Sequence, residues 1–344
     1  MPLLVTSASG ANGNGFGALL AFESDGRLRG TFIDDDRITD PRGLAVDPKE
    51  NLLFLNSGAD RVLAISSQGR VVRDTGRIEG LNPGGGTFGP DGRYYVGLRG
   101  TRTIIALSTS LDAAVEHVLP PRVVPFPRGF AFGLGGRLLL ASGISPNGQG
   151  DNTIMAFTPA ASTPLPPVRL VADPELSPLD LAIAPNGNIV VSSEHPFGAE
   201  DAVTTVREYD ARDGHLVRVF SPNGKAAFRK PRGLRFSSSG LLYCAARDEV
   251  VSFDSMTGKC LGPVAQLPRL NGQALVLFPD RNSHSKSAVT KRNVQTAEHV
   301  GSSLNYSPNV GIWEVIVTRS MKIMRVQFHR TINQRGTARR KCTQ

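Results

Sequence analysis

The chain has 344 residues, among them 37 glycines, 24 prolines and 3 cysteines, and 40% of it is hydrophobic. A chain of this length can bury a large core, which excludes a small fold held together by disulfides. The net charge of +9 belongs to the C-terminal end, because positions 281–344 hold 12 of the 39 Lys and Arg but only 2 of the 30 Asp and Glu. The nearly neutral stretch before it, rich in glycine and proline, favours a globular domain of many short strands.

Three short apolar runs open the chain and are predicted to form strands: Leu3–Ser7, 18–23 and Leu28–Ile33. The N-terminus lacks the basic and apolar regions of a signal peptide. No apolar run reaches the length of about 18 residues that a membrane-spanning helix needs. We therefore expect a soluble cytoplasmic protein with no transmembrane segment.

A phrase built on Pro-Arg-Gly then recurs along the chain and marks the start of each repeat. The clear copies begin at Pro41, Pro127 and Pro231, and weaker copies begin at Pro83, Pro178 and Leu270. Successive starts are separated by 42, 44, 51, 53 and 39 residues. A period of this size is typical of the four-stranded blades of a β-propeller.

Within each repeat the hydrophobic residues alternate with polar ones, which indicates half-buried strands separated by glycine-bearing or asparagine-bearing turns. The second strands of the repeats are predicted at 52–56, 94–98, 138–142, 189–193 and 241–245. The third strands are predicted at 62–66, 103–108, 153–158, 205–209 and 250–254.

The two ends of the repeat array complement each other. The last phrase, at 270–278, has no strands after it, whereas the three early strands have no phrase before them. If the late strand joins the early three, six four-stranded blades close into a ring, and closure removes the open sheet edges that favour aggregation. We expect an all-β, six-bladed propeller over residues 1–280.

The repeats resemble a known group of propellers. Positions 41–48 read Pro-Arg-Gly-Leu-Ala-Val-Asp-Pro, which is similar to the opening of NHL repeats and of the wider six-bladed set that includes SMP-30/gluconolactonase-like proteins. The resemblance implies an NHL-type platform that binds a small anionic ligand or a protein partner through one loop-rich face. The alternative that it implies is a lactonase-like hydrolase or lyase for a small anionic substrate in the central channel. The platform is favoured here, because no acid–base pair can be assigned.

Arginine follows proline in the three clear copies of the phrase, at Arg42, Arg128 and Arg232. A propeller places these equivalent positions around the mouth of its channel. Because guanidinium groups suit carboxylate and phosphate oxygens, we predict that the three arginines bind an anion. Asn271, at the same position of the last copy, and His195, in a long loop, are expected to complete this site. The alternative is that each arginine binds a local carbonyl or carboxylate.

SMP-30-like propellers also hold one divalent cation through carboxylates and asparagines at the channel mouth. The resemblance implies Asn82, Asp180 and Glu194 as the corresponding ligands here, for Ca²⁺ or another divalent cation, since such cations prefer oxygen ligands. No early glutamate matches the opening Gly-Glu-Gly-Pro of that family. Long loops at 7–15, 143–152 and 193–201 add further polar candidates, among them Asn12, Asn14 and Asn147.

Positions 281–344 do not follow the pattern of the repeats. Their first part is polar and aperiodic, as in a linker or a disordered segment. The apolar runs at 312–317 and 321–328 could form a small hairpin. Such a basic tail could contact nucleic acid or an anionic membrane, or it could be a poorly structured extension without a role, which the lack of a recognisable binding module favours.

Overall fold

The computed structural model describes residues 2–8, 17–112, 115–144, 148, 151–159, 166–220 and 229–278, and the backbone of three strands further on. The chain divides into two compact units, Met1–Arg281 and Asn282–Gln344. In the part of the chain that the structure describes, no helix has the length and apolar character needed to span a membrane.

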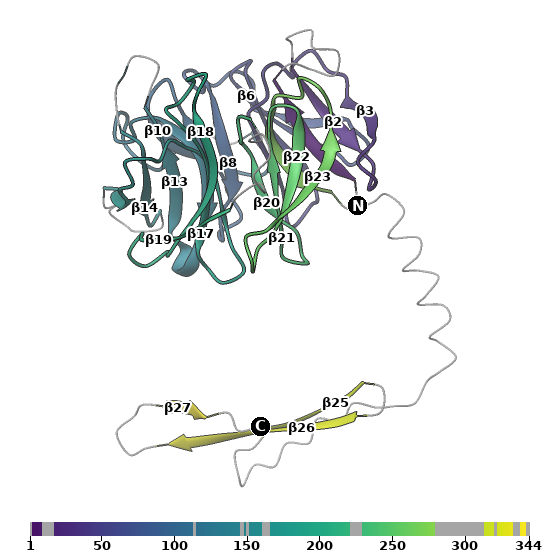
Figure 1. Ribbon diagram of the computed structural model, residues 1–344, viewed down its shortest axis with the longest axis vertical. Coiled ribbons are helices and arrows are strands. Elements are labelled where there is room, and N and C mark those ends of the chain that lie inside the picture. The colour runs from purple at the N-terminus through teal and green to yellow at the C-terminus, as the bar shows by residue number, and fades with distance from the viewer. Residues whose placement is uncertain are drawn as a thin grey trace. The chain divides into compact units, whose positions relative to one another are not determined.

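The first unit consists of six antiparallel sheets of four strands each (Figure 1). The innermost strands are β4 (Gly43–Val46), β8 (Pro83–Phe88), β12 (Pro127–Phe132), β16 (Pro178–Ile183), β20 (Leu234–Phe236) and β24 (Gly272–Leu277). The second strands are β5 (Leu53–Ser57), β9 (Tyr94–Leu98), β13 (Leu138–Ser142), β17 (Ile189–His195), β21 (Leu241–Ala245) and β1 (Leu3–Ser7).

The outer half of each sheet follows the same plan. The third strands are β6 (Arg61–Ile65), β10 (Thr103–Leu107), β14 (Thr153–Phe157), β18 (Val203–Tyr209), β22 (Glu249–Asp254) and β2 (Ala18–Phe22). The outermost strands are β7 (Val71–Asp74), β11 (Glu116–His117), β15 (Val168–Val171), β19 (Leu216–Phe220), β23 (Cys260–Gln266) and β3 (Leu28–Ile33). A 3₁₀ turn, η1 (Leu134–Gly136), joins β12 to β13.

The ring closes as the sequence predicts. β24 pairs antiparallel with β1, with Leu277 opposite Leu3 and Leu275 opposite Val5. Figure 1 shows these N-terminal strands, in purple, beside the green strands at the other end of the first unit. The innermost strands contact one another in the cyclic order β24, β4, β8, β12, β16, β20 and back to β24. The prediction of a closed six-bladed propeller is therefore confirmed.

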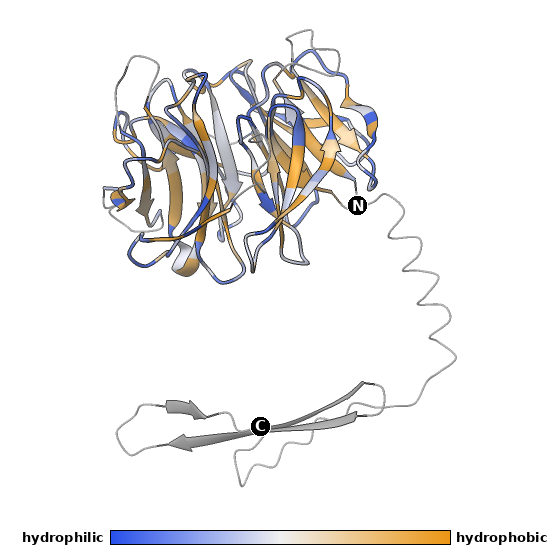
Figure 2. Cartoon of the chain, in the orientation of Figure 1, coloured by the Kyte–Doolittle hydropathy of each residue, from blue (hydrophilic) through white to orange (hydrophobic). Residues whose placement is uncertain are grey.

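The hydrophobic core lies between neighbouring sheets, because each inner strand buries side chains on both faces. All five residues of β1, β5, β9 and β13 are buried, and Figure 2 shows the matching hydrophobic strands. One cluster joins Leu4 and Ala274 of the closing sheet to Leu44 and Leu63 of the next sheet. Such shared clusters fix each sheet against its neighbour.

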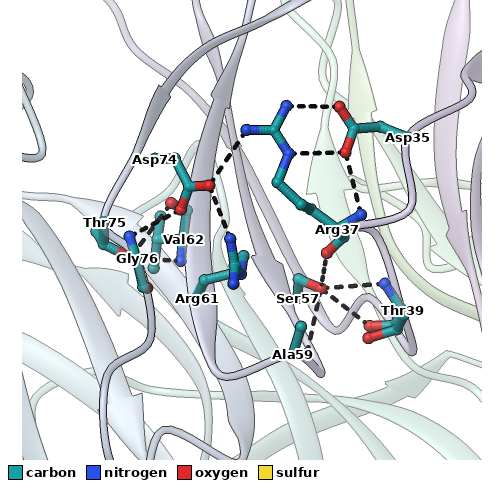
Figure 3. A network of polar contacts seen from close by, with 10 residues as sticks. All are labelled: Asp35, Arg37, Thr39, Ser57, Ala59, Arg61, Val62, Asp74, Thr75 and Gly76. Carbon is teal, nitrogen blue, oxygen red and sulfur yellow. Dashed lines mark hydrogen bonds and ion pairs between the residues drawn. The ribbon is translucent and has the colours of Figure 1, made fainter.

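A polar network adds to this packing where the closing sheet meets the next one (Figure 3). Arg37, in the connection from β3 to β4, donates to both carboxylate oxygens of Asp35 at 2.8 and 2.7 Å. Its remaining nitrogen donates to Asp74 of β7 at 3.2 Å, and Arg61 of β6 donates to the same carboxylate at 2.8 Å. The network ties the connection that leaves the closing sheet to the outer edge of the adjacent sheet.

The second unit contains a separate three-stranded sheet. β25 (Trp313–Arg319) pairs antiparallel with β26 (Lys322–Ile332), which also pairs with β27 (Ala338–Lys341). The first two of these strands cover the two apolar runs in which the sequence suggests a hairpin.

Candidate functional site

One cavity of about 790 Å³ lies where the six sheets meet, and every sheet contributes residues to its wall. The cavity is lined by six of the residues that the sequence singles out: Arg42, Arg128, Arg232, Asn271, His195 and Asp180. Asn82 is exposed and Glu194 is buried, and neither is part of the wall. Asn12, Asn14 and Asn147 lie outside the described residues.

The Pro-Arg-Gly phrase places its arginines by a recurring local structure. The backbone N–H of Arg42 donates to Asn56 in the second strand, and that of Arg232 donates to Ala245 in the same way. The glycine that follows is needed because the next inner strand passes very close. A Cβ at Gly129 would lie 2.3 Å from a carboxylate oxygen of Asp180, in the neighbouring sheet.

Each of the three predicted arginines makes local contacts, as the alternative reading expects. Arg42 donates to Asp40 and to Gln273, both at 2.8 Å. Arg232 forms an ion pair with Glu194 at 2.7 Å. Arg128 differs, because its contacts at 3.2 and 3.3 Å are to backbone carbonyls and it forms no ion pair with a described carboxylate. Local ion pairs therefore neutralise two of the three charges, whereas Arg128 is only partly compensated by the more distant Glu194.

Two further arginines line the cavity and were not predicted from the sequence. Arg99, in the turn after β9, lies over the ring of Phe126 at 4.8 Å and has no hydrogen bond or ion pair among the described side chains. Arg235, in β20, donates to the carbonyl of Leu44 at 2.9 Å and lies 3.6 Å from Asp180. Neither residue occupies the arginine position of the repeated phrase, so the repeat gives no signal for them.

Burial makes these charges costly. Burial, together with the guanidinium groups of Arg42 and Arg128, lowers the pKa of Arg99 to about 9. Burial and the charge of Arg232 lower the pKa of Arg128 to about 10. A guanidinium group still carries its proton at neutral pH. The lowered pKa values therefore describe two cations held in an unfavourable environment, which an anion in the cavity would relieve.

Asp180 is the one carboxylate in the wall, among the described residues. Its Oδ2 accepts the backbone N–H of Leu234 at 2.9 Å. Burial raises the pKa of Asp180, and the nearby Arg235 only partly opposes this effect. The proton of Asp180 consequently influences the net charge of the cavity.

His195 lines the cavity as the last residue of β17, and not in a loop as the sequence suggests. The Oγ atom of Ser177 lies 3.1 Å from its Nδ1 and accepts a hydrogen bond from Asn152 Nδ2 at 3.1 Å. The Ser177 hydroxyl can donate to Nδ1 while it accepts from Asn152, because it has one proton and two lone pairs. In that arrangement a neutral imidazole carries its proton on Nε2, from which it can donate a hydrogen bond to an anion.

A glycine strand forms the wall next to the arginines. Gly84, Gly85 and Gly86 of β8 all line the cavity. The Asn56 side chain donates to the carbonyl of Gly84 at 2.9 Å and so holds this strand in place. A Cβ at Gly85 would lie 2.5 Å from the carbonyl oxygen of Arg128. The absence of side chains here lets β8 and β12 approach each other and keeps space in the cavity.

The described residues do not offer a divalent cation a suitable site in this cavity. The carboxylates of Asp180 and Glu194 already lie beside Arg235 and Arg232, and Asn82 is outside the wall. An excess of guanidinium groups repels a cation. The group of acidic and histidine donors that the described residues do bring together, Asp210, Asp213 and His215, lies on the turn between β18 and β19, where Asp213 and His215 are exposed.

No family model and no curated protein matches the sequence. Solved structures are similar to it in fold. A protein of unknown function from Bacteroides caccae has a TM-score of 0.57 at 15% identity, over 81% of this chain and 99% of that one. A gluconolactonase from Xanthomonas campestris has a TM-score of 0.54 at 19% identity, over 78% and 86%. A streptogramin B lyase has a TM-score of 0.51 at 14% identity, over 70% and 73%. At these identities the similarity establishes the six-bladed propeller fold.

Proposed function

We propose that the protein is a small-molecule enzyme of the hydrolase or lyase kind, which acts on an anionic substrate in the central cavity. One observation carries this proposal: Arg99 and Arg128 line the cavity and form no ion pair with any carboxylate that the structure describes. Uncompensated buried charge is unfavourable for folding, so its retention at a cavity suggests a ligand of opposite charge. Propellers of similar fold include a gluconolactonase and a streptogramin B lyase, which is consistent with small-molecule chemistry at such a channel.

The residues of the cavity suggest how an anionic substrate would be held. The arginines would orient its acidic group through paired hydrogen bonds, and His195 Nε2 would donate to a further oxygen. Charge that develops on a carbonyl or leaving oxygen would be stabilised by the same fixed donors. Ser177 and Asn152 act as positioning residues, since they set the tautomer of His195 and do not themselves need to reach the substrate.

The test measures binding and turnover together. The full chain is mixed with a panel of small carboxylates, phosphates, lactones and esters, and its melting temperature is recorded. Hits are assayed for hydrolysis or elimination. We expect at least one anion to raise the melting temperature, and the replacement Arg128→Gln to reduce turnover at least about tenfold. The matched control is Arg29→Gln, which removes an exposed arginine of β3 and should leave turnover unchanged.

The effect of divalent cations on the melting temperature is measured in the same experiment. Ca²⁺ and Mg²⁺ are added separately, with a chelator as the reference. A stabilising effect that disappears in Asp213→Asn would assign the cation to the β18–β19 turn and not to the cavity. If no anion changes the melting temperature and no compound is turned over, the proposal of an anion-processing enzyme is wrong.

A noncatalytic platform has one observation in its favour. Phe197 and Ile144 line the cavity and are also 51% and 41% exposed. Exposed apolar side chains beside a cationic cavity suit an acidic peptide or protein partner. Anion binding without turnover of any compound in the panel would favour this second function.

A further inference from the structure

Two aromatic rings separate three guanidinium groups in the wall of the cavity. The order is Arg99, Phe126, Arg128, Phe197 and Arg232, here called the arginine–aromatic row. Arg99 and Arg128 lie 4.8 and 5.5 Å from the centroid of Phe126. Arg128 and Arg232 lie 4.2 and 5.6 Å from the centroid of Phe197. All five residues line the cavity.

The rings explain how like charges remain close together. The face of an aromatic ring is electronegative, so each ring attracts the guanidinium groups beside it and offsets part of their mutual repulsion. This attraction does not neutralise the charges. It holds the donors in place before a ligand arrives, which lowers the entropy lost on binding.

The charge balance of the wall indicates what the row would bind. Three of the five arginines have a carboxylate nearby: Arg42 with Asp40, Arg232 with Glu194 and Arg235 with Asp180. Arg99 and Arg128 form no ion pair among the described residues, although Asp40 and Glu194 act on their charges from further away, and Arg128 is only 4% exposed. The Nε atoms of both are buried without a hydrogen-bond partner. Two cationic charges without an ion pair among the described residues, and two unused Nε donors, therefore lie beside a single ring, that of Phe126.

We infer that the ligand of this cavity is a small dianion, either a dicarboxylate or a phosphate monoester, whose two charges are met by Arg99 and Arg128. This inference rests on the proposed function and makes its substrate class more specific. A monoanion would leave one guanidinium group uncompensated in a partly dry cavity, whereas a dianion compensates both. Arg128 and Arg99 contact the same ring, so one small molecule can reach the two groups.

The experiment compares ligands that differ in one charge. Calorimetric titration of the full chain at low salt and about pH 7.5 uses succinate against monomethyl succinate, and methyl phosphate against dimethyl phosphate. A phosphate monoester is largely dianionic at this pH. In at least one of the two pairs, we expect the dianion to bind about tenfold more tightly or better than its monoanionic partner. The pair with the larger ratio identifies the ligand as a dicarboxylate or a phosphate monoester.

Substitutions in the arginine–aromatic row test whether its guanidinium groups cause the preference for a dianion. Arg99→Gln is expected to reduce the dianion-to-monoanion ratio to about threefold or less, because one of the two uncompensated charges is gone. Arg128→Gln should do the same and serves as the second variant if the first does not fold. Arg29→Gln, at an exposed position outside the cavity, should keep the wild-type ratio. Thermal melting of each variant confirms that it is folded.

The outcomes separate the two proposals. Equal binding of dianion and monoanion in both pairs would show that the ligand is not a dianion, although the cavity would still be an anion site. A ratio that Arg99→Gln and Arg128→Gln leave unchanged would likewise contradict the dianion inference. Failure of every anion to bind would overturn the proposed function as well.

Discussion

Arg99 contributes to the cavity at the expense of the stability of the empty protein. Its guanidinium group lies over Phe126 but has no hydrogen bond or ion pair among the described residues. We predict that Arg99→Gln stabilises the ligand-free protein by about 1 kcal/mol, since the relief of a half-buried charge without an ion pair exceeds the lost cation–π contact. The melting temperature should rise by about 2–4 °C.

A scanning calorimetry experiment without ligand tests this stabilisation. Arg93→Gln is the contrasting variant, because Arg93 lies over Tyr95 and pairs with Asp91 at 2.7 Å. That replacement should lower the melting temperature. A fall of similar size in Arg99→Gln would mean that Arg99 supports the fold and is not held there for a ligand.

Asp180 provides a pH dependence for anion binding. Burial raises its pKa above the usual value of 3.8. As the pH falls through the raised pKa, the carboxyl group takes up a proton, the cavity loses a negative charge and anion affinity rises. The proton also stabilises the folded state, and this stabilisation is fully present below pH 3.8 and is lost as the pH rises through the raised pKa.

We therefore predict that Asp180→Asn binds anions about three- to tenfold more tightly than the wild type at neutral pH. Its affinity should also vary less between pH 7 and pH 4, because the amide does not titrate. Calorimetric titration at several pH values gives both quantities. Weaker binding by Asp180→Asn at neutral pH would show that the carboxylate helps to hold the ligand.

The repeat predicts three arginines of the site, and the loop pattern and the family resemblance add His195 and Asp180. Arg42, Arg128 and Arg232 share one position of a recurring phrase, and a propeller brings equivalent positions together around its axis. Arg99 and Arg235 reach the same cavity from positions at which the other repeats carry different residues, such as Ala45 and Ala131 at the position of Arg235. Their location depends on how neighbouring sheets pack, which periodicity alone does not reveal.

At the scale of the strand, β8 depends on its glycines. A Cβ at Gly85 would lie 2.5 Å from the carbonyl oxygen of Arg128 and 3.0 Å from the Cα of Gly129. Both atoms belong to the backbone of β12 and cannot move aside without displacing that strand. We predict that Gly85→Ala lowers the free energy of unfolding by about 1–3 kcal/mol and weakens anion binding through the shift of Arg128.

Chemical denaturation and ligand titration together test this effect of Gly85→Ala. Gly133→Ala is a suitable control, because the nearest atom to its Cβ would be a terminal carbon of the Leu139 side chain, at 3.1 Å. A flexible side chain can adjust, so we expect the control to change stability by less than about 1 kcal/mol. Equal losses in the two variants would contradict the close approach of β8 and β12.

Strands were more predictable from the sequence than site residues, because alternation with period two marks a half-buried strand directly. The second strands at β9, β13 and β21 have the predicted bounds. β20 is shorter than its equivalents and begins only at Leu234, three residues after Pro231. β11 has only the two residues Glu116 and His117. The period-two pattern does not predict these shorter strands.

For the whole molecule, the ring is complete without residues 282–344, since all six sheets lie within Met1–Arg281. We predict that removal of residues 282–344 changes the melting temperature by less than about 2 °C and preserves a single transition. Removal of residues 1–7 should abolish the transition, because it takes away β1 and leaves β24 without its partner.

The same truncated protein tests the basic tail. A large fall in melting temperature would show that residues 282–344 stabilise the propeller. Retention of the full chain, but not of the truncated chain, on DNA or on anionic vesicles at low salt would assign an electrostatic contact to the tail.

The pairing of β1 with β24 also limits how early a newly synthesised chain can complete its fold. Thr6 and Ala274, which hydrogen-bond across this sheet, are 268 positions apart in the sequence. At translation rates of about 5–20 residues per second, the first strands leave the ribosome roughly 15–50 s before their inner partner exists. During that interval β1 exposes an unpaired hydrophobic edge. We therefore expect the nascent chain to need chaperones more than an array of self-contained blades would, and slower synthesis of the middle blades would increase that need.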